Sequence, residues 1–175
     1  VTVTNAPTPE TIRHLCDGRI DFGIVSTPVE KRASLKCVPV KEIWDVFVAG
    51  RKFEYLKERM LGYEELMKLP VMCLEGNTST RTYVEQFLAS KQVTIRPEFE
   101  LATSDMLIQF AVRNLGIASV VRNFAEEHLT EGDLFELRFL EEIPARTFCI
   151  VANERIPLSA AAATLMNVLV QGTSQ

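Results

Sequence analysis

Short apolar runs that follow helical patterns are the feature of this sequence that most constrains its fold. In the first instance, Ile12, Leu15 and Cys16 repeat at helical spacing, and the unbroken apolar run Phe22–Val25 follows. Such a run is typical of a strand covered on both faces. Val1–Thr4 alternates as a strand does, so the start of the chain predicts a strand–helix–strand unit with a parallel sheet.

The same alternation continues through the chain. The predicted strands are Ile43–Ala49, Val71–Leu74, Phe99–Ala102, Ile117–Val121 and Arg146–Ala152, and the predicted helices are Glu54–Leu61, Tyr63–Met67, Thr80–Ser90 and those begun by Thr103-Ser104 and by Ser159. The late strand and last helix have no partner in the middle of the chain, so we expect them to join the first strands. The predicted class is α/β with two lobes, neither contiguous in sequence.

Composition excludes several kinds of protein. The 175 residues carry 19 Lys+Arg and 23 Asp+Glu, a formal net charge of −4, which argues against a chain that itself grips a nucleic acid backbone. No apolar run reaches the roughly 20 residues that span a bilayer. Val1–Thr4 has neither a basic start nor an apolar core, so no secretory leader is expected and we predict a cytoplasmic protein without a membrane partner.

Metal, cofactor and catalytic signals are weak. Cys16, Cys37, Cys73 and Cys149 are scattered without a CxxC pair, which favours buried free thiols in a reducing compartment. Only two histidines are present, so no metal site is expected. The chain has no GxSxG, P-loop, HExxH or GxGxxG motif, and we predict no cofactor and no catalytic residue.

Hydroxyl side chains follow most of the predicted strands, at the edge where open α/β sheets bind ligands. The candidate binding residues are Ser26, Thr27, Asn77, Thr78, Ser79, Arg81, Thr103, Ser104 and Arg122. Two of these loops lead into helix starts, which favour anions, and the arginines could contact a carboxylate or oxyanion. Each loop alone is most simply a helix cap, and Arg81 alone is most simply solvated; their convergence favours the binding interpretation.

Four segments resemble, in order, the effector-binding domain of LysR-type transcriptional regulators. They are Glu10–Val25, with its helix, Gly18 and Asp21-Phe-Gly-Ile; Leu61–Gly76, with Pro70, a strand and Glu75-Gly76; Thr103–Val121, with Gly116-Ile-Ala; and the last helix from Leu158. Each segment is weakly specific alone, and four in register cover the whole chain.

The resemblance implies a type 2 periplasmic-binding-protein fold with mixed, mainly parallel sheets. Lobe one would comprise residues 1–43 and 144–175, lobe two 44–143, and a small-molecule effector would bind in a cleft between them. The implied function is effector sensing that controls DNA binding through a population shift in a homodimer or homotetramer. The family's DNA-binding winged helix-turn-helix, and a first strand and helix, have no counterpart in the sequence.

Two alternatives to a transcription regulator remain open. One is a solute-binding protein of the same fold, and the other, less favoured, is an enzyme on this fold. The peroxide-sensing members of the family carry a reactive cysteine just after the Glu-Gly turn, where this chain has Asn77-Thr78-Ser79-Thr80, so redox sensing at that loop is not expected.

Overall fold

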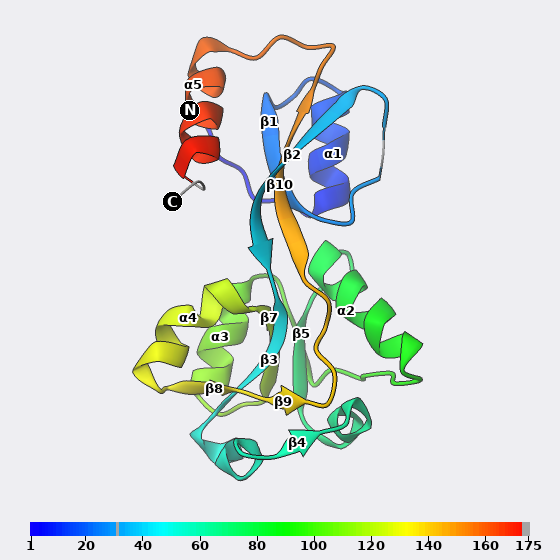
Figure 1. Cartoon of the computed structure of the whole chain (residues 1–175), viewed down its shortest axis with the longest axis vertical. Coiled ribbons are helices and arrows are strands. Elements are labelled where there is room, and N and C mark those ends of the chain that lie inside the picture. Colours follow the sequence, from blue (N-terminus) through cyan, green and yellow to red (C-terminus); the bar gives the residue numbers. More distant parts are fainter. Residues whose placement is uncertain (31, 173–175) are drawn as a thin grey trace. The chain divides into compact units, whose positions relative to one another are not determined.

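Unit 1 comprises Val1–Glu42 and Arg146–Gln175 in the computed structural model, and its described residues form three strands and two helices. The structure describes residues 1–30 and 32–172. The strand order is β1-β10-β2, with β1 at Phe22–Ser26, β2 at Leu35–Ile43 and β10 at Arg146–Asn153 (Figure 1). The late strand therefore joins the sheet of the first strand, as the sequence predicts.

The beginning of the chain differs from the prediction. Val1–Thr4 is exposed and forms no strand, and β1 pairs with β10 in antiparallel register, with Ile24 opposite Ile150. A strand is held by hydrogen bonds to a neighbouring strand. Because no described strand pairs with Val1–Thr4, its alternating pattern does not become a strand, and the predicted parallel unit is wrong at this place.

Helix α1 (Thr8–Cys16) covers the sheet of unit 1 through Ile12 and Leu15. These side chains pack with Val25 of β1 and with Cys149 and Val151 of β10. Helix α5 (Ala160–Gly172) begins where predicted, because the Ser159 hydroxyl accepts a hydrogen bond from the Ala162 amide at 3.2 Å.

Unit 2 (Ile43–Ala145) contains a mixed five-stranded sheet in the order β6-β5-β7-β3-β8. Strand β5 runs parallel to β6 and β7, whereas β3 runs antiparallel to β7 and β8. The strands are β3 Asp45–Gly50, β5 Val71–Leu74, β6 Phe99–Leu101, β7 Ile117–Val121 and β8 Leu134–Glu136. The predicted strands of this region are confirmed to within a few residues.

The helices of unit 2 cover both faces of this sheet (Figure 1). Helix α2 (Ser79–Ser90) packs Val84 and Leu88 into one hydrophobic cluster, and α3 (Ser104–Val112) packs Leu107 and Ala111 into another. Helix α4 (Arg122–Glu131) joins the second cluster. The loops after β5 and β6 therefore lead to opposite faces of the sheet.

The segment between β3 and β5 departs from the predicted helix at Glu54–Leu61. It forms a 3-10 helix η1 at Arg51–Leu56, and Met60–Leu61 becomes strand β4, parallel to β9 at Arg138–Phe139. Phe53 and Leu56, three residues apart, are both buried, and that spacing suits one 3-10 turn. The helical turn predicted at Tyr63–Met67 is present as η2 (Tyr63–Lys68). No helix in the described part of the chain is long and apolar enough to cross a membrane.

Candidate functional site

The carboxyl ends of β5 and β6 bring two of the predicted loops together in unit 2. The Glu75 amide, just after β5, donates a hydrogen bond of 3.1 Å to the carbonyl of Leu101 at the end of β6. The two strands are neighbours whose connections lead to helices on opposite faces, α2 and α3. In open α/β sheets, ligands bind at the carboxyl ends of strands whose connections lead to opposite faces in this way.

Thr78 caps helix α2. Its hydroxyl accepts a hydrogen bond from the Arg81 amide at 3.3 Å and donates one to the Glu75 carbonyl at 3.0 Å. The hydroxyl proton is therefore already used in a hydrogen bond within the loop. Asn77 is exposed and Ser79 is half-buried at the first helical position.

Thr103 caps helix α3 in the same way, but its hydroxyl acts there only as a hydrogen-bond acceptor. Its hydroxyl accepts a hydrogen bond from the Met106 amide at 3.3 Å, which leaves its proton for another acceptor. Ser104 follows as the first helical residue and is half-buried. The amides of the first turn of a helix have no partner within the helix, so this start suits an anion.

Arg81 is buried rather than solvated, with 8% of its surface exposed. Its guanidinium donates to the Leu74 carbonyl at 3.0 Å and to carboxylates of Glu85 at 2.6 Å and Glu100 at 3.5 Å. These contacts fasten the start of α2 to the end of β5. The expectation of a solvated side chain is wrong, because the carbonyl and the two carboxylates accept the hydrogen bonds that water would accept at an exposed arginine.

Ser26 and Thr27 lie at the end of β1 in unit 1, where Arg146 contacts both. The Ser26 hydroxyl accepts from the Arg146 guanidinium at 2.9 Å and the Thr27 carbonyl accepts from it at 3.3 Å. Arg146 is buried, with 3% of its surface exposed. Sequence reasoning missed it, although a charged residue opening an otherwise apolar strand is a signal that could have singled it out.

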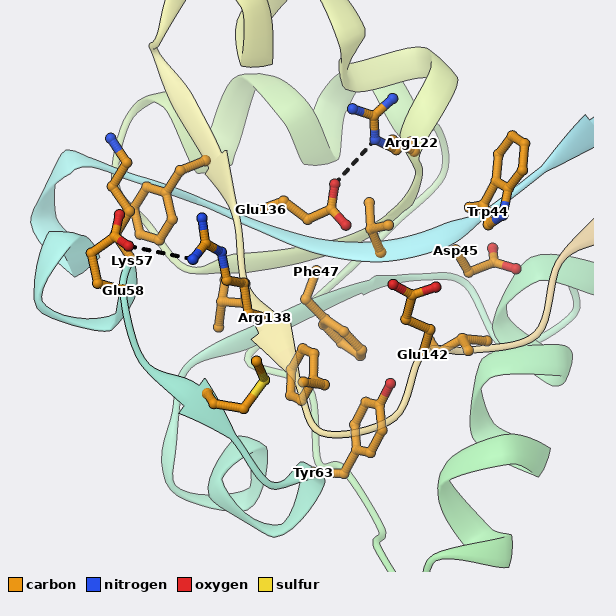
Figure 2. A pocket seen from close by; sticks show the side chains of 16 residues that line it. Trp44, Asp45, Phe47, Lys57, Glu58, Tyr63, Arg122, Glu136, Arg138 and Glu142 are labelled. Atoms are coloured by element: carbon orange, nitrogen blue, oxygen red, sulfur yellow. Dashed lines mark hydrogen bonds and ion pairs between the residues drawn. The ribbon is translucent and has the colours of Figure 1, made fainter.

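A groove of about 770 Å³ opens elsewhere in unit 2, between β3, β4 and β9 (Figure 2). Of the predicted residues only Arg122 lines it. Tyr63 and Phe139 are among its apolar lining, with stacked rings whose centroids lie 4.3 Å apart. Sequence reasoning did not find this groove, because its walls come from segments far apart in the chain.

The charges that line this groove are largely paired with one another. Arg122 donates to Glu136 at 3.2 Å and Arg138 donates to Glu58 at 3.4 Å (Figure 2). Arg122 also donates to Glu126, outside the lining, at 2.8 Å. The lining holds four carboxylates, Asp45, Glu58, Glu136 and Glu142, against three cations, Lys57, Arg122 and Arg138. An anion would meet a net negative lining here, so the groove suits an anionic ligand poorly.

Comparison with known proteins gives the family. The model of the LysR substrate binding domain matches residues 1–174. The chain belongs to this family. Among curated proteins, the HTH-type transcriptional activator CmpR of Synechocystis is 27% identical to this LysR domain over 73 residues, which are 42% of the chain. That match spans 24% of the length of CmpR.

Solved structures confirm the predicted periplasmic-binding-protein-like α/β fold. The regulatory domain of Synechocystis CcmR in complex with 2-PG has a TM-score of 0.83 at 19% identity, covering 97% of this chain and 81% of that one. The effector binding domain of QuiR in complex with shikimate has a TM-score of 0.79 at 13% identity, covering 97% and 79%. The regulatory domain of HypT from Salmonella typhimurium has a TM-score of 0.80 at 17% identity, covering 99% and 82%.

Proposed function

We propose that this LysR domain senses a small anionic metabolite, a carboxylate or an oxyanion, and thereby controls transcription. Binding shifts the population of domain conformations, and DNA is contacted by a winged helix-turn-helix domain of the whole protein. We further propose that the protein works in the cytoplasm as a homodimer or homotetramer and has no catalytic activity of its own.

The observation that carries the proposal is the pair of helix starts joined by the hydrogen bond from the Glu75 amide to the Leu101 carbonyl. Both starts present first-turn amides at one edge of the sheet, and helix dipoles favour negative charge there. In the comparisons, CcmR is described with 2-PG and QuiR with shikimate, both of which carry acidic groups.

Within this site the residues take different roles. Thr103 and Ser104 contribute hydroxyl donors, whereas Thr78 holds the α2 start in place and Asn77 and Ser79 line its approach. Ser26 and Thr27, oriented by Arg146, are the proposed contacts from unit 1. Arg81 positions the loop, and Arg122, which is already paired with two carboxylates, contributes least.

Two alternative functions predict different observations. A solute-binding protein of this fold would bind the same anion, but the gene would encode a secretory leader in place of a DNA-binding domain. An enzyme on this fold would convert the bound anion and would depend on a carboxylate or a cysteine. The family match favours the regulator over both alternatives.

Isothermal titration of the purified chain with 2-PG, shikimate and inorganic sulfate tests the proposal. We expect at least one of these anions to bind and Ser104→Ala to weaken its binding about 10- to 150-fold, because a hydrogen bond to an ionised ligand contributes roughly 1.5–3 kcal/mol. Tight binding of a neutral apolar compound that is unaffected by Ser104→Ala and Ser26→Ala would overturn the anion proposal.

Ser90→Ala is the matched control. Ser90 is the last residue of α2, is exposed, and donates its hydroxyl to the carbonyl of Phe87 in the same helix. Ser90→Ala removes the same chemical group as Ser104→Ala, but at the last residue of a different helix and away from both helix starts, so the affinity should stay unchanged. Glu126→Ala is a poorer control, because Glu126 is paired with Arg122.

A further inference from the structure

The groove between β3, β4 and β9 has no role in the anion binding proposed above. All of its lining residues belong to unit 2, and Arg122 is the single one that is also a candidate of the anion site. Its volume of about 770 Å³ lies within the range of small-molecule pockets, roughly 300–1,000 Å³. Five aromatic residues line it: Trp44, Phe47, Tyr63, Phe135 and Phe139. Their rings offer apolar surface to the carbon skeleton of a ligand.

The charged side chains of the lining are divided between the two ends of the groove. Lys57 lies toward one end with the ion pair of Arg138 and Glu58, whereas Asp45 and Glu142 lie toward the other end (Figure 2). The second end therefore carries carboxylates from two segments that are far apart in the chain.

Glu142 is the carboxylate that a ligand can reach at this end. Its side chain is exposed, and no cation among residues 1–30 and 32–172 forms an ion pair with it. Arg122, which lines the same groove, donates to Glu136 and Glu126 instead. A positively charged group in the groove would therefore find an acceptor in Glu142 without displacing a cation of the protein.

The charge of Glu142 also acts on the wall of the groove. Burial, and then the carboxylates of Glu141 and Glu142, raise the pKa of the Tyr63 hydroxyl. Tyr63 stacks on Phe139, so apolar ring surface and negative charge occur close together. Aromatic faces attract cations as well, and the indole of tryptophan attracts them most strongly. Trp44 is 40% exposed, so its ring is accessible.

We propose that this groove binds a small organic ammonium ion that carries an aromatic body. The ammonium group donates to the Glu142 carboxylate beside the indole of Trp44, and the aromatic body packs against Tyr63 and Phe139. This site takes a ligand of the opposite charge to that of the anion site, and it does not depend on the proposed function.

The fluorescence of Trp44 tests the proposal directly, because the chain has one tryptophan and it lines the groove. Three probes with a similar phenylalkyl body differ in charge: phenethylamine is a cation at neutral pH, phenethyl alcohol is neutral and hydrocinnamate is an anion. We expect phenethylamine to bind most tightly. The alcohol should bind about 3- to 30-fold more weakly, because it lacks the ion pair and the cation–π contact, and hydrocinnamate should bind most weakly.

Glu142→Gln removes the charge at an exposed side chain and keeps its shape. We expect it to weaken phenethylamine binding about 1.5- to 5-fold, the range for an exposed ion pair, and to leave binding of the alcohol unchanged. Glu127→Gln is the matched control, because Glu127 is exposed on α4 outside the lining and its loss changes the net charge equally. Ser104→Ala should also leave phenethylamine binding unchanged, which separates this site from the anion site.

The indole N–H signal of Trp44 in the NMR spectrum of the labelled chain gives a second readout of the same titrations. Three results would overturn the proposal. One is the absence of a saturable change in both signals at millimolar phenethylamine. Another is equal affinity for the amine and the alcohol, and the third is an equal effect of Glu142→Gln and Glu127→Gln.

Discussion

Thr78 and Thr103 show how residues of the same type, each in front of a helix, acquire different chemical capacities. Both cap their helices, but the Thr78 hydroxyl also donates to the Glu75 carbonyl. A hydroxyl has one proton to donate. Only the local fold of each loop decides whether that proton remains for a ligand, which is why the two side chains looked equivalent in the sequence.

Tyr63 gives a prediction about alkaline pH. Burial, and then the nearby Glu141 and Glu142 carboxylates, raise the pKa of its hydroxyl, which donates to the Glu141 carbonyl at 2.8 Å. The unfolded chain releases this proton near pH ~10, whereas the folded chain keeps it, so stability is retained below that pH and falls as the pH rises above it.

We expect Tyr63→Phe to lower the free energy of unfolding by about 0.5–1.5 kcal/mol at neutral pH and to flatten the loss of stability above pH ~10. Urea unfolding across that range measures both effects. Tyr55→Phe, at a side chain that is 63% exposed, is the control. An unchanged alkaline slope in Tyr63→Phe would contradict this assignment.

Arg81 yields a second prediction at the residue scale. Arg81→Met removes the hydrogen bond to the buried Leu74 carbonyl and both carboxylate contacts, so the free energy of unfolding should fall by about 1–3 kcal/mol. Arg96→Met, at an exposed arginine in the loop after α2, should change it by less than about 0.5 kcal/mol. Equal effects in the two variants would show that Arg81 is not a structural clamp.

At the scale of elements, the close approach of β7 to the chain before β5 depends on Gly116. A Cβ there would lie 2.6 Å from the Pro70 carbonyl oxygen, which also accepts the hydrogen bond of the Ile117 amide. Because that oxygen belongs to the backbone, it cannot move aside at little cost, and overpacking of this kind is destabilising.

Gly116→Ala should therefore lower the free energy of unfolding by about 1–3 kcal/mol. Gly76→Ala is its matched control, since a Cβ at that position would meet no atom within 4 Å. Gly76 also lies in the loop after β5, so the same variant reports on ligand access. Denaturant midpoints measure the difference, and equal stability of the two variants would refute it.

At the scale of the whole molecule, an anion that binds only the folded domain should raise its thermal stability. At a ligand concentration of 100 times Kd the gain is about 2.7 kcal/mol. For a chain of this length we expect the midpoint to rise by roughly 5–11 °C. Differential scanning calorimetry with the anion identified by titration measures the shift, and Ser104→Ala at the same anion concentration should reduce it.

The sequence by itself determined the class of the molecule, most of its elements and its family resemblance. Apolar runs, helix caps at Thr103 and Ser159 and the glycine after Leu115 act locally, so their effect can be recognised without a partner. The two helix starts of the proposed anion site were also inferred from strand ends and hydroxyl residues.

Tertiary structure alone decided which segments meet. Val1–Thr4 has the pattern of a strand, but no strand among the described residues pairs with it. Met60–Leu61 becomes a strand because β9 lies beside it. Arg81 is buried because a carbonyl and two carboxylates accept its hydrogen bonds. Pairing, burial and contact depend on a second segment distant in sequence, and no local pattern encodes which segment that will be.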